Sequence, residues 1–459
     1  MSAPNPAPAY RPQRPRSVFG PLMLVAIGVV LLLCTTGMLS WHSFWLGFAR
    51  YWPVVLVLWG VAKLAEYVWA RQKGYPSPRL GPGSIVFLVF FILFGTALTR
   101  ASNWNWAGIR SEIESDSDVD VSDFLGSGYD FTDNYAQPLP EAAQIKVLLN
   151  RGDISVTPST DSQAHLIVRK TLRGDSQNDA NRLNDSTRAK FQQQGGIWVL
   201  DLTGGDYQRG RFNLDLQLPR NAVLSLSTHY GNVTVSGRNG SLDVSSDHGD
   251  VSAEQITGDA SLRLKHGNLT AKNISGNVTV DGTVSDSNIS GVGGTLTLTG
   301  TYWGDMQLSH IAKQVHFISS RTDLQFARLD GDFNMQPDEL RASAVSGPFK
   351  LDTRSKSVHL EDVTGDVHID DRNASVEMRP KGPLGNIDVS NVHGEIDLSL
   401  PAGAGFQLDA QSIGGEIQSD FNVSVDNSGN TATARGTVGK GGPAMRLKAD
   451  HGTIQLRKQ

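Results

Sequence analysis

The sequence predicts an all-β repeat domain of the β-solenoid or β-helix kind, attached to an N-terminal α-helical membrane region of three spans. Apolar residues form dense blocks before about residue 100, whereas Gly, Asp, Asn, Ser and Thr dominate after it, with single Val, Ile and Leu residues between them. In this second part, a glycine followed by a short alternating apolar and polar run recurs to the C-terminus. The two parts are therefore expected to face different solvents, lipid and water.

Composition limits the function classes and the forces that hold the large domain together. The chain has 459 residues and a net charge of −5, and no lysine-rich or arginine-rich tract follows the apolar blocks. This charge pattern argues against a nucleic-acid partner. The single cysteine, Cys34, lies in the first apolar block. We therefore expect the large domain to fold without disulfides, by backbone pairing and packing alone.

Three apolar blocks, at about 21–39, 51–70 and 83–99, have the length of helices that cross roughly 30 Å of hydrocarbon. A signal peptide is a poor interpretation of the first block, because no small-residue cleavage site follows it and two further spans do. Lys63 and Glu66 lie three residues apart in the second block. This spacing puts them on one helix face, close enough to form a charge pair.

The placement of lysine and arginine predicts the orientation in the membrane. Most of the positive charge around the spans lies in residues 1–17, a proline-rich tail, and in the connection between the second and third blocks. The positive-inside rule puts this tail, which we expect to be disordered, in the cytoplasm, and everything after the third span outside. The prediction is a multi-pass protein of the bacterial inner membrane with an extracytoplasmic, or periplasmic, C-terminal domain.

The start of the second span has a recognisable order of residues. From Arg50 to Gly60 the sequence reads RYWPVVLVLWG. This order of Trp-Pro, apolar run and Gly resembles the signature of the LiaI/LiaF-like bacterial transmembrane region, and the resemblance covers about residues 18–100. It implies a connection with cell-envelope stress signalling, with which that family is associated.

A linker at 101–134 separates the spans from the repeats, and from Ser111 to Asp123 it is acidic and rich in small residues. Three aspartates alternate with other residues from Asp116 to Asp120, as ligands do in a calcium-binding loop. Val121 and Ser127 occupy the positions where such a loop needs its turn glycine and its closing glutamate. The stretch is therefore predicted to be a solvated extracytoplasmic linker.

From 135 to 459 the chain repeats one unit, which is a glycine, then Asp or Asn, then an alternating run. The most regular copies are nine residues apart, which fits one strand of about five residues and one turn. Such a strand cannot bury its apolar face alone, but stacked copies bury a continuous narrow core. Glycine suits the corners because it takes positive φ, and Asp or Asn can hydrogen-bond the turn backbone. The predicted turn glycines are Gly152, Gly231, Gly249, Gly258, Gly267, Gly276, Gly365 and Gly394.

Two units give a period of 18 residues. Tyr230, His248 and His266 recur at this interval, and we expect them to stack as a ladder of side chains on one edge. The segment 175–194 breaks the alternation and is rich in Asn, Gln, Arg and Ala. It predicts a short helix or a long loop before a strand at 197–202.

This order of strands, interrupting segment and regular array resembles a bacterial β-strand-repeat domain of unknown function that is often labelled "putative adhesin". The resemblance covers about residues 135–459 and rests on many repeats. It implies a stack of β-strands, and it carries little information about biochemistry.

Two kinds of chemistry compete with a purely structural interpretation of the repeats. His248 and His266 offer nitrogen ligands for a transition metal, but no cysteine and no fixed carboxylate accompanies them. A β-helix enzyme acting on polysaccharide would use a distinct pair of carboxylates. The aspartates here follow the repeat, and none stands apart: Asp250, Asp259, Asp281, Asp305 and Asp332. The sequence therefore predicts no catalytic, cofactor-binding or metal-binding residue.

We expect a non-enzymatic, membrane-anchored protein whose β-repeat domain acts as an envelope binding module or an adhesin-like module. Its expected partners are the lipid bilayer and either another envelope protein or cell-wall glycan, with no nucleic acid and no cofactor. One alternative is a regulator of a cell-envelope stress signalling system that acts through its transmembrane helices. A second alternative is a glycan-active β-helix enzyme.

Overall fold

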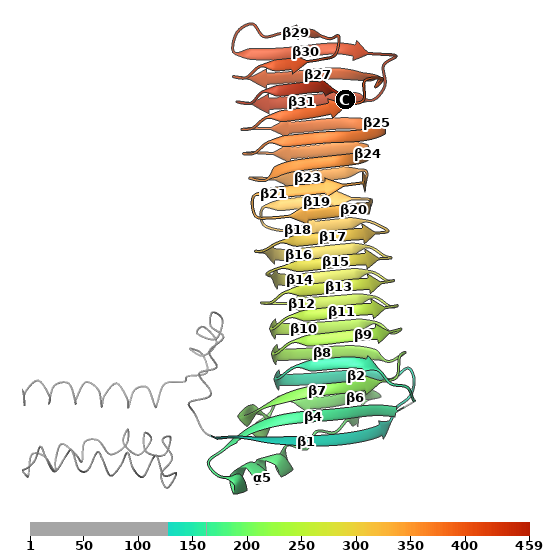
Figure 1. Cartoon of the computed structure of the whole chain (residues 1–459), viewed down its shortest axis with the longest axis vertical. Coiled ribbons are helices and arrows are strands. Elements are labelled where there is room, and N and C mark those ends of the chain that lie inside the picture. The colour runs from blue at the N-terminus through green and yellow to red at the C-terminus, as the bar shows by residue number, and fades with distance from the viewer. Residues whose placement is uncertain (1–126, 162) are drawn as a thin grey trace, which may run out of the picture. The chain divides into compact units, whose positions relative to one another are not determined.

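The computed structural model describes residues 127–161 and 163–459 (Figure 1). The predicted tail, the three spans with Lys63 and Glu66, and the linker up to residue 126 lie outside the described residues. Within the described part, no helix is long and apolar enough to cross a lipid bilayer.

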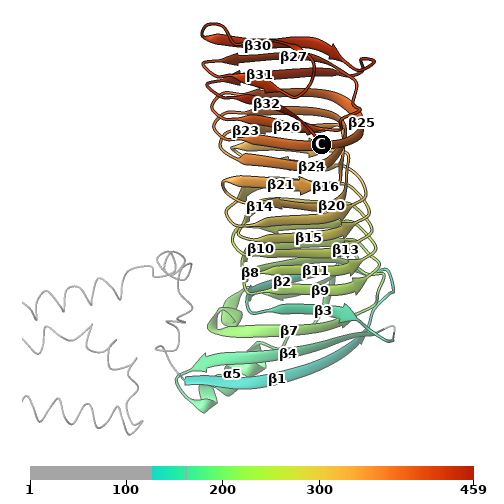
Figure 2. The ribbon, with the colours of Figure 1, turned by 45° about the horizontal axis from the view of Figure 1, so that its top comes forward.

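The described residues form a two-sided stack of β-strands, which confirms the predicted β-repeat solenoid (Figures 1 and 2). Each turn of the chain adds one strand to each side, and neighbouring strands on a side run parallel. The first side holds β8 (Val223–Tyr230), β10 (Leu242–His248), β12 (Ala260–Leu264), β14 (Val278–Val284), β16 (Leu296–Tyr302) and β18 (Val315–Ile318). The second side holds β9 (Val233–Arg238), β11 (Val251–Ile256), β13 (Leu269–Ile274), β15 (Ser287–Val292) and β17 (Met306–Ile311).

The core is a narrow apolar layer between the two sides. Alternate side chains of each strand point inward, and the register places like residues above one another. Val233, Val251 and Leu269, which are 18 residues apart, occupy equivalent positions and are at most 1% exposed. The 18-residue period therefore corresponds to one rung, which is one strand from each side.

Two corners join the sides of the regular stack. The first corner leads from a first-side strand to the following second-side strand, as between β8 and β9, and the second corner leads back. Five of the predicted turn glycines have positive φ, and those of the regular stack lie at the first corner: Gly152, Gly231, Gly249, Gly267 and Gly365.

The prediction that glycine is needed for its positive φ is wrong for Gly258, Gly276 and Gly394, which do not have positive φ. These three are needed for space, because the backbone of an adjacent rung lies where a side chain would begin. A Cβ atom would come 2.8 Å from the carbonyl carbon of Gly240 at Gly258, and 2.1 Å from the carbonyl oxygen of Ala374 at Gly394.

At the N-terminal end of the stack, the order in space differs from the order in sequence. The outermost rung is formed by β6 (Ile197–Leu202) and β7 (Gly210–Leu218), and the rung next to it by the earlier strands β2 (Gln144–Arg151) and β3 (Ile154–Pro158). The interrupting segment contains the helix α5 (Gln177–Ser186), so both the helix and the strand at 197–202 are confirmed.

The base is completed by β4 (Gln163–Gly174), which runs antiparallel to β7, and by β1 (Ser127–Pro138), which pairs with β4. Residues 127–134 are therefore strand and not part of the predicted linker. The apolar and polar alternation of a strand is not visible in this sequence, because Asp133 occupies an inward position between Phe131 and Tyr135. Its charge is paired with that of Lys170, which lies far away in the sequence.

One reversed rung interrupts the parallel stack. β19 (Thr322–Phe326) and β20 (Arg328–Met335) are antiparallel to the strands before and after them. Parallel pairing then resumes from β21 (Glu339–Ser343) and β23 (Phe349–Thr353) to two long strands that bend across both sides, β24 (Ser357–Asp371) and β25 (Val376–Asn391).

The C-terminal end repeats the arrangement of the base. β31 (Ala444–Asp450) lies between β25 and β27 (Phe406–Ile413), and β32 (Ile454–Lys458) lies between β26 (Ile396–Leu400) and β28 (Ile417–Ser419). The end is covered by β30 (Thr431–Val438), which pairs antiparallel with β27. The strands inserted at each end thus form an interior rung.

Candidate functional site

Asp and Asn residues, most of them from the Gly-Asp/Asn motif, form a ladder along the first corner. Oδ1 of each side chain from Asn213 to Asp286 accepts a hydrogen bond from the backbone N–H of the equivalent residue in the next rung, at 2.8 to 3.1 Å, and Asp305 is the last donor. The ladder therefore links successive rungs, whereas the motif predicted a bond within one turn. Its members are Asn213, Asp153, Asn232, Asp250, Asn268, Asp286 and Asp305.

Beside this ladder, the structure places the three predicted ring residues in one stack. The rings of Tyr230 and His248 are 4.9 Å apart and 9° from parallel, and those of His248 and His266 are 4.8 Å apart and 2° from parallel. Arg151 extends the stack at the other end, with its guanidinium carbon 5.7 Å from the Tyr230 ring centre. Sequence reasoning missed Arg151 because it comes from the inserted rung and not from an 18-residue interval.

A row of charged side chains lies beside the stacked rings and is formed by the residues that directly precede them in the sequence, His229, Asp247 and Lys265. His229 Nδ1 lies 2.6 Å from Asp247 Oδ2, and Lys265 Nζ lies 2.8 Å from Asp247 Oδ1. Burial acts to raise the pKa of Asp247, but the hydrogen bonds from Lys265 and His229 outweigh it and lower the pKa. Burial, together with the nearby His266 and His229, lowers the pKa of His248, which favours the neutral ring in the stack.

The same corner continues to an exposed tryptophan. The Ser285 N–H bonds the carbonyl oxygen of Gly267, and the Trp303 N–H bonds that of Val284, so Trp303 lies two rungs beyond His266. Val284 is fully buried, whereas Trp303 is 70% exposed. We call the surface formed by Arg151, Tyr230, His248, His266 and Trp303 the ring edge.

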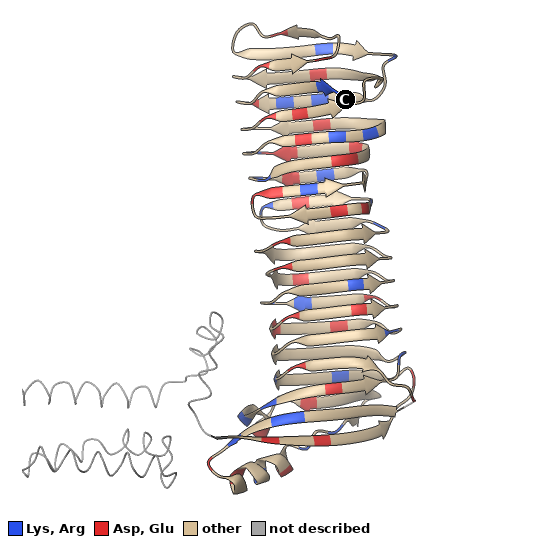
Figure 3. Ribbon diagram, in the orientation of Figure 1, with Lys and Arg blue, Asp and Glu red and all other residues tan. Residues whose placement is uncertain are grey.

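A cavity of about 460 Å³ lies over the second side, at the reversed rung and the rungs that follow it. Figure 3 shows Lys, Arg, Asp and Glu on the ribbons of this part of the stack. The cavity is lined by Asp332, Asn334, Arg341, Ala342, Ser343, His359, Leu360, Glu361, Glu377 and Arg379. Arg341, His359 and Glu377 are 18 residues apart and in register, an interval that could have identified them from the sequence.

Charged groups in and beside the cavity hold one another in place. The two ring nitrogens of His359 contact two carboxylates, with Nε2 3.2 Å from Glu339 and Nδ1 3.1 Å from Glu377. Arg341 binds Glu339 at 2.6 Å, and Arg379 binds Glu377 at 2.8 Å. The hydrogen bond from Arg341 lowers the pKa of Glu339. Burial acts to raise the pKa of Glu377, but its bonds to His359 and Arg379 outweigh this and lower it.

The aspartates considered for catalysis do not form one cluster. Asp250 and Asp305 belong to the first-corner ladder, and Asp259 accepts the Asn277 N–H at 2.7 Å in a similar ladder at the second corner. Asp332 lines the cavity. Within residues 127–161 and 163–459, no group of three or more His, Cys, Asp or Glu residues is arranged to hold a metal ion.

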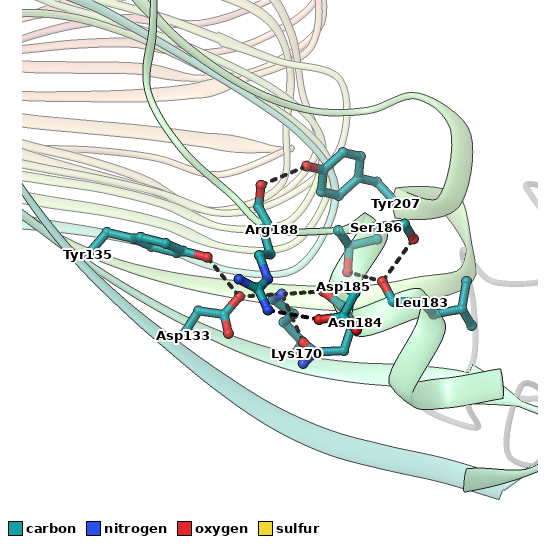
Figure 4. Close-up of polar contacts among 10 residues, drawn as sticks. Asp133, Tyr135, Lys170, Leu183, Asn184, Asp185, Ser186, Arg188 and Tyr207 are labelled. Atoms are coloured by element: carbon teal, nitrogen blue, oxygen red, sulfur yellow. Dashed lines mark hydrogen bonds and ion pairs between the residues drawn. The ribbon is translucent and has the colours of Figure 1, made fainter. Parts of the chain in front are cut away.

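A polar cluster at the base fastens β1 to the rest of the domain (Figure 4). The Lys170 side chain is fully buried, pairs with Asp133 of β1 and donates to Oδ1 of Asn184 at 3.0 Å. The Tyr135 hydroxyl donates to Asp133 at 3.2 Å, and burial raises the pKa of Tyr135. The cluster is sheltered and internally satisfied, which fits a structural role.

Comparison with known families matches both parts of the chain. The model of the family described as Toastrack DUF4097 matches residues 114–457, and that of the LiaI-LiaF-like transmembrane region matches residues 18–64. Both resemblances inferred from the sequence are thereby confirmed. The second match implies association with a membrane.

Several solved structures are similar to 72% of this chain. One is a "putative cell adhesion protein" from Clostridium sporogenes, with 11% identity, 100% of its own chain covered and a TM-score of 0.15. Others carry the label "putative adhesin", among them two from other bacteria. The one from Bacteroides fragilis has 11% identity, 98% coverage and a TM-score of 0.20, and the one from Parabacteroides merdae has 10%, 97% and 0.21. No curated protein matches the chain.

Proposed function

Because the chain belongs to the Toastrack DUF4097 family, whose model covers residues 114–457, we propose that it is a membrane-anchored envelope protein with a non-enzymatic binding domain. The LiaI-LiaF-like match at residues 18–64 supports the anchor. The positive-inside rule supports an extracytoplasmic position for the β-domain. Cell-wall glycan is the proposed partner.

The observation that carries this proposal is the ring edge. Trp303 is 70% exposed, and exposed tryptophans are frequent anchors of binding surfaces. Trp303 lies on the same corner as a ladder of carboxylate and amide side chains, several of which are exposed to solvent. An aromatic face beside such groups fits a sugar, because its C–H face packs on the ring and its hydroxyl groups bond the polar side chains.

Co-sedimentation of the full-length protein in detergent micelles with isolated cell-wall sacculi tests this function. Trp303→Ala is expected to weaken binding severalfold. Val425→Ala, which changes another exposed apolar residue, is the matched control and should bind as the unchanged protein does. Deleting residues 233–268 removes two turns with His248 and His266 and joins equivalent positions, so it should keep the fold and reduce binding further.

Three outcomes would contradict the proposal. The first is wall binding that survives both Trp303→Ala and the two-turn deletion. The second is capture of membrane proteins in place of wall glycan. The third is release of soluble sugar fragments from the sacculi, which would favour the glycan-active enzyme.

A second candidate function follows from the membrane region. The LiaI-LiaF-like match favours a regulator of envelope stress signalling that acts through its helices. A chain truncated after residue 126 should then still alter the stress response in cells, whereas the binding module predicts that this response requires the β-domain.

Topology is tested separately, by reporter fusions. An alkaline phosphatase fused after Gln459 should be active, and a reporter that works only in the cytoplasm should be silent there. The reverse pattern would place the β-domain in the cytoplasm, where it could not contact the cell wall.

A further inference from the structure

The cavity over the second side has the size and the rigidity of a small-molecule site. Its volume of about 460 Å³ lies in the range of roughly 300 to 1,000 Å³ that is usual for ligand pockets. The side chains that line it stand on paired strands, and Arg341 and Arg379 are each held by a glutamate. Little reorganisation is therefore needed before a ligand binds.

The lining selects a hydrophilic ligand. Drug-like and lipid ligands fill pockets that are mostly apolar. Here the only apolar lining residues among those described are Ala342 and Leu360, which are themselves buried in the core. The other groups are carboxylate, guanidinium, amide, imidazole and hydroxyl. Planar groups with two donors or two acceptors suit the neighbouring hydroxyl groups of a sugar.

The charge of the lining disfavours an anion. Three carboxylates, those of Asp332, Glu361 and Glu377, face two guanidinium groups. Glu339 adds a fourth carboxylate, 2.6 Å from Arg341. Both arginines are already paired with glutamates. An acidic sugar would therefore meet carboxylates with no arginine left to neutralise it.

One lining atom lacks a partner. Oδ1 of Asn334 is buried and accepts no hydrogen bond from the described residues. Asn334 belongs to the reversed rung and is the register partner of Arg341. A buried acceptor without a donor is unfavourable, and a hydroxyl or amide N–H of a ligand would satisfy it.

From these observations we infer that the cavity binds one unit of a neutral or amino-bearing glycan, as a second contact point beyond the ring edge. This inference rests on the proposed function, since it names the sugar class that the β-domain recognises. The glycan meets the amide of Asn334 and the carboxylates of the cavity while the ring edge holds another part of the wall.

Calorimetric titration of the full-length protein in detergent micelles tests the site with three probes. A tetramer of β-1,4-linked N-acetylglucosamine represents the neutral class, a glucosamine tetramer the amino-bearing class and tetragalacturonate the acidic class. Binding of one or both of the first two is expected, at least tenfold tighter than that of tetragalacturonate. Equal or tighter binding of the acidic probe would overturn the inference.

The decisive variant is Asn334→Ala, because it removes an atom that contributes no internal hydrogen bond. It should lower the affinity for the bound probe about tenfold or more while the melting temperature stays the same or rises. Asn288→Ala, which changes an exposed residue of β15 in the same register column, is the matched control and should change neither. Unchanged affinity of Asn334→Ala would assign the probe to another surface.

The two proposals fail in different ways. If sacculi bind in a manner that depends on Trp303 but no oligosaccharide binds at the cavity, the cavity inference is wrong and the proposed function stands. If neither sacculi nor oligosaccharides bind, both are wrong.

Discussion

Asn268 donates its backbone N–H to Oδ1 of Asp250, 18 residues earlier, over 2.8 Å. Asp250 in turn donates its own N–H to Oδ1 of Asn232. Each member between the two ends of the ladder thus accepts a bond from the next rung and donates one to the rung before. The motif requires a side-chain oxygen at a fixed distance from the backbone, which both Asp and Asn provide.

Substitutions in this ladder should distinguish the contribution of the side-chain oxygen to stability from that of the carboxylate charge. Asp250→Leu removes the acceptor for Asn268 and should cost about 1 kcal/mol of unfolding free energy, the usual net worth of one hydrogen bond. Asp250→Asn keeps Oδ1 and should cost much less. Urea denaturation of the two variants checks this, and equal losses would show that the bond between rungs contributes little.

Gly267 should be among the least replaceable residues of the first corner. Its φ is +141°, and a Cβ atom there would lie 2.2 Å from the carbonyl oxygen of Gly249. Gly267→Val should destabilise the domain by at least about 1 to 3 kcal/mol, the cost of a forced backbone conformation. Gly403 has neither a positive φ nor an atom within 4 Å of such a Cβ, so Gly403→Val is the control. Equal melting temperatures would refute the corner assignment.

The pair of Lys170 and Asp133 should fasten β1 only while both charges are present. Lys170→Met leaves a largely buried carboxylate unpaired and should cost about 3 kcal/mol, whereas the double variant with Asp133→Leu should recover much of this loss. Thermal unfolding measures both. Arg188→Met breaks the exposed pair with Asp185 and should have no measurable effect. Additive effects at Lys170 and Asp133 would rule out the coupling.

Asp371 should make the domain less stable as the pH rises. The residue is 2% exposed, and burial raises its pKa from 3.8 to about 6, although backbone N–H bonds oppose the shift. The folded state therefore binds the proton more tightly than the unfolded state. This contribution is complete below about pH 4 and is lost as the pH rises to about 6, by up to about 3 kcal/mol.

Asp371→Asn should remove this dependence. The variant should melt higher than the unchanged protein at pH 7.5 and about equally at pH 4, because its amide is neutral at both. It also brings a donor to its register partner Asn391, whose buried Oδ1 has none among the described residues. Asp281→Asn, on an exposed part of β14, is the control. A melting difference that is the same at both pH values would exclude Asp371 as the titrating group.

The regular repeats could be predicted because their information is local. A glycine, an Asx residue and an alternating run specify a strand and a corner, and the 18-residue interval brought together Tyr230, His248 and His266. Trp303 escaped because it does not lie at that interval. The register partner of Val284 is Tyr302, and Trp303 is the residue after it. Asn334 escaped, and the position of Asp332 in the cavity could not be predicted, because the reversed rung places both beside β21 and no spacing in the sequence indicates a change of strand direction.

The strand order at the ends of the stack could not be predicted from the sequence for a related reason. Arg151 meets Tyr230 only because β2 is inserted between β6 and β8, and Asp133 looked like part of an acidic linker because Lys170, its partner, lies in another strand. Such pairings depend on which distant segments of the chain come into contact, and a periodic sequence pattern does not specify these contacts.

The inserted strands at both ends also restrict how such a protein can change in evolution. Recombination between similar copies lengthens or shortens a simple repeat array, and an array with open ends can gain a copy anywhere. Here β2 and β3 at one end, and β31 and β32 at the other, are each held between strands that are distant in sequence. Gain or loss of a copy at an end would disrupt the pairing of these inserted strands with their neighbours. Between residues 223 and 302, whole 18-residue turns are interchangeable, so height can change there while both ends keep their form.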